Sequence, residues 1–189
     1  MSQATGTLLA ACIAAAISVM TLISSTMRDR RTELRVSRRD GVKPYIDTLA
    51  QATWECVAIA STIVKRGAQG QDISKWAERG QSASDDLKKL RLKIRYTLPG
   101  LEGPIRTLSL VPGWAGHLRA DEALSERLIR DATELRTAID ACVTRVSVDG
   151  LTPRKKDMKR AAEMADAVAK IIDRSPRNDS NGTPAARPQ

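Results

Sequence analysis

Hydrophobic and polar positions divide the chain into one uniformly apolar run and several segments with helical periodicity. Residues 6–27 contain no charged side chain. At about 1.5 Å per residue, this run would extend about 33 Å as a helix, enough to cross a hydrocarbon core about 30 Å thick. We therefore expect residues 1–27 to form a single N-terminal transmembrane anchor.

Two other interpretations of this run fit the sequence less well. A cleaved export signal has positive charge before its apolar centre and a small-residue cleavage site after it. The opening MSQATG has no Lys or Arg, and SSTMRDRR offers no such site. A buried helix of a soluble protein needs no charge-free run of this length.

Residues 28–44 are expected to form a basic juxtamembrane stalk that ends in a hinge. As a helix this segment would be polar nearly all round, and DGVKP at 40–44 would break it because of Gly41 and Pro44. Its arginines are predicted to contact lipid headgroups and to hold the C-terminal domain in the cytoplasm by the positive-inside rule. They are Arg28, Arg30, Arg31, Arg35, Arg38 and Arg39.

Small residues recur at every fourth position of the apolar run. Such a ridge lets two helices approach closely in lipid, so it is a candidate homodimer face. The alternative is that an alanine-rich run meets this spacing by chance. The ridge consists of Gly6, Ala10, Ala14 and Ser18.

Four later segments show the spacing of amphipathic helices, at residues 45–66, 72–98, 121–146 and 152–174. Their apolar stripes and short connections predict an antiparallel four-helix bundle over residues 45–174. Few aromatic residues are present (Trp 3, Tyr 2, Phe 0), which also favours packed helices over sheets. Residues 175–189 are rich in Pro, Asn, Ser and Gly, so they are expected to be a disordered tail.

The connection at residues 101–119 is unusually long and apolar. Its glycines and prolines predict at most a short helical turn near Pro104. Two roles are open for it: a cap over one end of the core, or a partner patch formed by Leu110, Val111 and Trp114.

Residues suited to catalysis or metal binding are scarce. His117 is the only histidine, which excludes metal sites built on histidine pairs. No phosphate-binding or dinucleotide motif is present. Cys12, Cys56 and Cys142 are far apart, and each lies in an apolar helical context, so buried reduced thiols are expected. We therefore predict no catalytic, cofactor-binding or metal-binding residue, and a protein that is not an enzyme.

The net charge of +9 suits an acidic partner. Basic blocks at 88–95 and 152–160 could contact phosphates, but no zinc finger or aromatic stacking platform accompanies them, which argues against nucleic acid. The leading hypothesis is a single-pass membrane protein whose helical bundle binds an unidentified protein or acts as a regulatory module at the cytoplasmic face. The alternatives are a membrane-tethered nucleic-acid-binding protein, and a small membrane-perturbing protein that oligomerises through its transmembrane helix.

Overall fold

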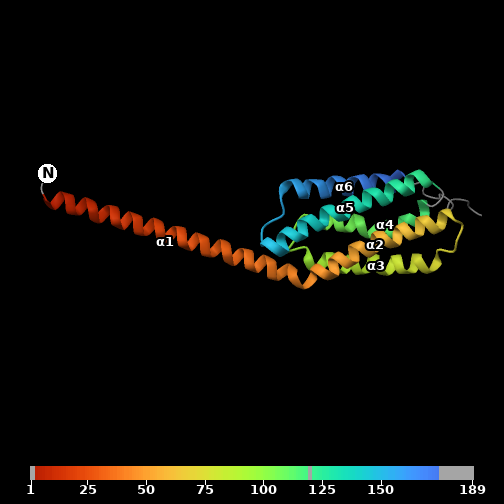
Figure 1. The fold of residues 1–189 in the computed structure, drawn as a ribbon, viewed down its shortest axis with the longest axis horizontal. Helices are drawn as coiled ribbons and strands as arrows, with labels where there is room; N and C mark the ends of the chain where they lie inside the picture. The colour runs from red at the N-terminus through yellow and green to blue at the C-terminus, as the bar shows by residue number, and fades with distance from the viewer. Residues whose placement is uncertain (1–2, 119–120, 175–189) are drawn as a thin grey trace, which may run out of the picture.

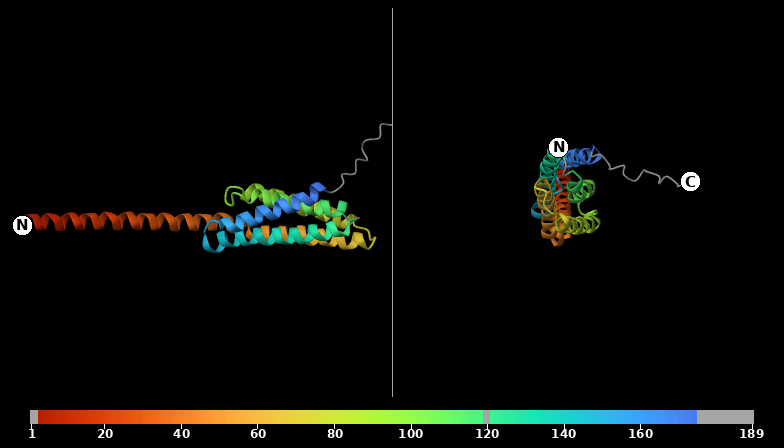
Figure 2. Two further views of the ribbon diagram at one scale, coloured as in Figure 1. Left: turned by 90° about the horizontal axis from the view of Figure 1, so that it is seen from above. Right: turned by 90° about the vertical axis from the view of Figure 1, so that its right-hand side faces the viewer.

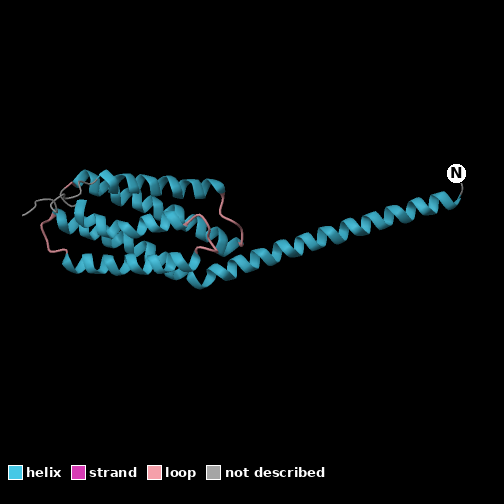
Figure 3. Ribbon diagram, turned by 180° about the vertical axis from the view of Figure 1, so that it is seen from behind, coloured by secondary structure: helices cyan, strands magenta, loops and turns pink. Residues whose placement is uncertain are grey.

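The fold is known from a computed structural model, which describes the backbone of residues 3–118 and 121–174 and side chains from residue 13 onward within those ranges. All regular structure in these ranges is helical, so the prediction of an all-α fold is confirmed (Figure 3). The elements are α1 Gln3–Val42, the 3-10 helix η1 Lys43–Tyr45, α2 Ile46–Ala68, α3 Ser74–Ile94, α4 Glu102–His117, α5 Glu122–Asp149 and α6 Lys155–Arg174.

A long helix projects from one end of a compact bundle (Figure 1). The projecting helix is α1, whose 40 residues correspond to about 60 Å at the usual rise. The other five described helices, α2 to α6, alternate in direction and pack side by side (Figures 1 and 2). The residues predicted as a disordered tail, 175–189, lie outside those described.

The prediction of four helices in the bundle is wrong, because residues 101–119 are not a loop. They form α4, a helix of 16 residues that packs against α2, α3, α5 and α6. Its inward face includes Ile105, Leu108 and Val111, all with 0% exposure. The segment is therefore neither a cap nor a surface patch as a whole; it supplies one wall of the core.

A close contact between α3 and α4 accommodates the ring of Pro112, which lies inside α4. Gly80 of α3 lies opposite the Pro112 ring, and a Cβ atom built on Gly80 would lie 2.9 Å from the proline Cβ. Glycine thus provides the space for the ring. The cost of Gly80 to helix propensity is offset by this approach, which also brings α3 close to Ile59 of α2.

The apolar stripes of the other helices meet in one core. Leu49, Cys56 and Ile63 of α2 lie seven residues apart and are all buried, and Leu128 and Leu135 of α5 follow the same spacing. This repeat brings successive side chains back to nearly the same face of a helix. The periodicity of these segments therefore identified their buried faces.

The last turns of α1 belong to the bundle. Val42 has 0% exposure, and Gly41 lies so close to Thr97 that a Cβ atom there would be 2.8 Å from the threonine Cγ2. Gly150, which ends α5 with φ of 63°, lies directly against the backbone of Arg35. The helix does break near DGVKP, at η1, but α1 is already docked about two turns earlier.

An aspartate side chain accepts backbone hydrogen bonds near the start of α3 and of α5. The Asp72 carboxylate accepts hydrogen bonds from the backbone N–H and the hydroxyl of Ser74 at 2.9 and 2.6 Å. Asp121 accepts one from the Leu124 N–H at 3.0 Å. The expected start at Thr152 and Pro153 is displaced, since α6 begins at Lys155 and the Thr152 carbonyl accepts a hydrogen bond from Arg145.

Candidate functional site

The most unusual surface of the described protein is the apolar part of α1. Large hydrophobic side chains there are half to three-quarters exposed and have no packing partner in the bundle. They are Ile13 53%, Ile17 60%, Val19 56%, Met20 74%, Leu22 68%, Ile23 50% and Met27 57%. Apolar surface on this scale marks an interaction site or a membrane contact.

These side chains occupy much of the circumference of α1. At about 100° per residue, positions 13 to 27 cover an arc of roughly 220°. A single partner helix would need only a narrow seam of alternating three- and four-residue spacing. The breadth of the arc therefore favours a surrounding apolar medium over one docked helix.

Most of the hydroxyl groups within this stretch donate to carbonyl oxygens one turn earlier in the same helix. Ser18 donates to the Ala14 carbonyl at 2.9 Å, and Thr21 donates to the Ile17 carbonyl at 2.7 Å. Ser25 and Thr26 both donate to the Leu22 carbonyl. Polar groups without an internal partner are costly in hydrocarbon, and these hydroxyls avoid that cost.

The predicted headgroup-binding arginines follow directly along the same helix. Arg28, Arg30, Arg31, Arg35 and Arg39 are exposed, and Arg38 is half-buried where α1 meets the bundle. Arg39 lies 3.9 Å from the Asp40 carboxylate, a weak surface pair. The apolar and cationic parts of α1 therefore adjoin without an intervening turn.

The predicted homodimer face is only partly described. The side chains of Gly6 and Ala10 lie outside the described residues, whereas Ala14 and Ser18 are exposed on α1. Among the described residues, no helix combines the length and the hydropathy needed to span a bilayer. The charge-free run of the sequence begins earlier, at Gly6.

The predicted partner patch does not form one surface. Val111 is fully buried and cannot contact a partner, while Leu110 is 39% exposed. Trp114 is half-buried, and its ring lies 5.5 Å from that of His117. The error arises because α4 is a helix, so adjacent residues point to different sides.

The chemistry-bearing residues of the bundle lie apart from one another. Among the described residues, no group of three or more His, Cys, Asp and Glu side chains could hold a metal ion. Cys56 and Cys142 are fully buried free thiols, and burial raises their pKa to about 12 and about 11. Such thiols are poor nucleophiles and metal ligands, since both roles need the thiolate.

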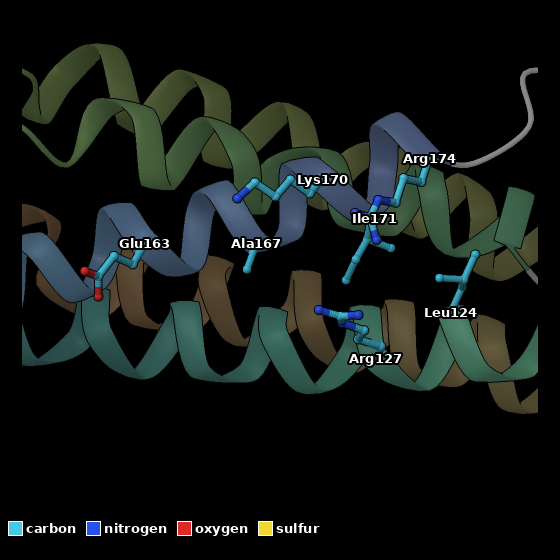
Figure 4. A pocket seen from close by; sticks show the side chains of 7 residues that line it. All are labelled: Leu124, Arg127, Glu163, Ala167, Lys170, Ile171 and Arg174. Carbon is cyan, nitrogen blue, oxygen red and sulfur yellow. The ribbon is translucent and has the colours of Figure 1, made fainter.

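Two grooves on the bundle were not predicted from the sequence. One, of about 350 Å³, lies between α2 and α5 and has Val64, Ala68 and Ile129 among its lining residues. A smaller one, of about 180 Å³, lies between α5 and α6 (Figure 4). Leu124, Ala167 and Ile171 supply its apolar side chains, and the others that line it are Arg127, Glu163, Lys170 and Arg174. No sequence motif marks these grooves, because they depend on how neighbouring helices splay.

Comparison with family models, with curated proteins and with solved structures finds no match to this chain.

Proposed function

We propose that this protein is a single-pass membrane protein in which α1 is the anchor and the bundle is an interaction or regulatory module at the cytoplasmic face. The observation that carries the proposal is the broad exposed apolar surface from Ile13 to Met27, which continues a charge-free run that begins at Gly6.

Magnitudes indicate which contact dominates. Fully burying an exposed large aliphatic side chain gains roughly 1.5–3 kcal/mol. Because the seven side chains of α1 are half to three-quarters exposed, together they gain roughly 6–13 kcal/mol on entering lipid. An arginine near anionic headgroups adds only about 1 kcal/mol. The apolar surface therefore drives membrane association, and the arginines orient it.

The orientation follows from the charge on the two sides of the apolar run. All six arginines lie on its C-terminal side, and the six residues before Thr7 carry no Lys or Arg. The side with the cations stays in the cytoplasm during insertion. The bundle, with the grooves described above, would then face cytoplasmic partners.

The test is extraction of membranes by alkaline carbonate after expression of the full chain. We expect the wild type to stay in the membrane pellet. Ile17→Arg combined with Leu22→Arg should release it, since each charge near the centre of the crossing costs about 3 kcal/mol. Leu34→Arg combined with Val36→Arg is the matched control: both residues are exposed on α1, but they lie beyond the first arginines. Release of the wild type would refute the proposal.

A further inference from the structure

We infer that the turn between α5 and α6 is a second docking surface, which binds the anionic headgroups of the membrane that α1 crosses. The surface consists of residues 148–160. The inference rests on the proposed function, which places this surface next to the membrane. Its partner is a bilayer that contains acidic phospholipid. This contact would fix the orientation of the bundle relative to the membrane surface.

Position is the first argument. The α5–α6 turn is the part of the bundle that reaches furthest toward the N-terminal end of α1 (Figures 1 and 2). Gly150 in this turn lies against the backbone of Arg35. Arg35 follows Met27 by eight residues, which is about 12 Å along the helix. The headgroup layer occupies about 5–8 Å of this distance, so the turn lies within about one screening length of the headgroups.

Charge is the second argument. Arg154, Lys155, Lys156, Lys159 and Arg160 are all exposed in this segment. Lys159 pairs with Glu163 at 3.6 Å, and Arg160 pairs with Glu134 at 3.7 Å. The other three form no ion pair with any described residue. They are therefore available to an external anion.

The helix dipole shows that these cations do not serve the helix itself. The N-terminus of a helix carries partial positive charge, so carboxylates stabilise it and cations destabilise it. Lys155 and Lys156 begin α6 and have the unfavourable sign, and Asp157 in the same turn offsets only part of their repulsion. By contrast, α5 begins with Asp121 and Glu122, the favourable sign, at the opposite end of the bundle. An anion outside the protein would offset the repulsion at α6.

Exposed apolar character accompanies the charge. Val148 in the last turn of α5 is 67% exposed, next to the cationic segment. Residues 148–160 include no aromatic side chain on which a base could stack. An apolar side chain among cations suits a lipid interface better than a nucleic acid.

The experiment measures the distance from this turn to the lipid surface in the full chain. A donor fluorophore is attached to Val148→Cys in a Cys12→Ser background, where the buried Cys56 and Cys142 do not compete for the label. The protein is reconstituted into vesicles of phosphatidylcholine, with or without about 30% phosphatidylserine, that carry a headgroup-labelled acceptor lipid. We expect energy transfer to rise about twofold with the acidic lipid, and to fall back in about 0.5 M salt, where the screening length is roughly 4 Å.

Two variants make the result specific. Arg154→Gln, Lys155→Gln and Lys156→Gln together should abolish the rise. The matched control, Lys65→Gln, Arg66→Gln and Lys75→Gln at the other end of the bundle, should retain it. No rise in the wild type, or an equal rise in the first variant, overturns the inference.

Failures of the two proposals are distinguishable. If the protein does not associate with neutral vesicles at all, the anchor is refuted as well as the docking surface that depends on it. If it associates but the turn does not approach acidic lipid, only the docking surface is refuted. Capture of labelled duplex DNA by the reconstituted wild type, lost in the first variant, would instead identify a nucleic-acid site and overturn the lipid assignment.

Discussion

Replacing Gly150 by alanine measures how firmly α1 is joined to the bundle. Gly150 has φ of 63°, and a Cβ atom there would lie 2.8 Å from the carbonyl carbon and 2.9 Å from the Cα of Arg35. Backbone atoms cannot rotate away as a side chain can. The substitution must therefore either shift α1 or distort the end of α5.

Gly70 provides a matched control. It has nearly the same backbone angle, φ of 67°, but a Cβ atom there would meet nothing within 4 Å. Alanine in the left-handed region costs about 1–2 kcal/mol at either position. At Gly150, overpacking adds about 1–3 kcal/mol. We expect a free energy of unfolding lower by about 1–2 kcal/mol for Gly70→Ala and by about 2–5 kcal/mol for Gly150→Ala.

The assay is urea unfolding of the full chain in a mild detergent, followed by helical circular dichroism. The slope with denaturant must stay constant for the comparison to hold. Gly150→Asn separates the cost of the backbone angle from the cost of overpacking, since asparagine tolerates positive φ but retains the Cβ atom. Equal losses for the two alanine variants would show that a Cβ atom at position 150 does not press on Arg35, and would refute the reasoning.

Three further outcomes are expected from the same unfolding assay and from thiol labelling. Gly80→Ala should lower the free energy of unfolding by about 1–2 kcal/mol, because the added Cβ overlaps Pro112 although alanine is the better helix former. Gly113→Ala, which has open space at its Cβ, should raise the free energy of unfolding by about 0.5–1 kcal/mol. A more stable Gly80→Ala variant would contradict the packing of α3 on α4. Asp140→Asn should stabilise the protein at neutral pH, because burial raises the pKa of this carboxyl despite nearby Arg136. The gain should be absent below the ordinary aspartate pKa and grow as the pH rises through the raised value; a gain that stays constant with pH would exclude this cause. The buried Cys56 and Cys142 should resist a thiol reagent in the folded protein and react in urea, and fast labelling without urea would refute their burial.

The sequence allowed most of the helices to be predicted because their periodicity is strong. Segment 45–66 corresponds to α2, and the buried Leu49 and Ile63 lie on the apolar face inferred from spacing. Segments 121–146 and 152–174 correspond closely to α5 and α6. In these cases one face is apolar and the other polar, so local pattern and tertiary packing agree.

The central helix α4 could not be predicted, since its local pattern opposes its structure. Gly103, Pro112 and Gly113 all weaken helix propensity. Packing against four neighbouring helices overrides it, and the space for Pro112 is supplied by Gly80, which is 32 residues away in sequence. A prediction based on residues close in sequence cannot detect a contact between residues so far apart in the chain. The same limit applied to the partner patch and to the docking of Gly150 on Arg35.

The unbroken course of α1 into the bundle has a mechanical consequence. A flexible tether would let a cytoplasmic domain tumble independently of its anchor, but Gln3–Val42 is one helix whose last residue is buried in the core. If α1 crosses a bilayer as proposed, any change in its inclination swings the whole bundle as a lever. Bilayer thickness alters helix inclination, and it would thus change the orientation of the bundle relative to the membrane surface.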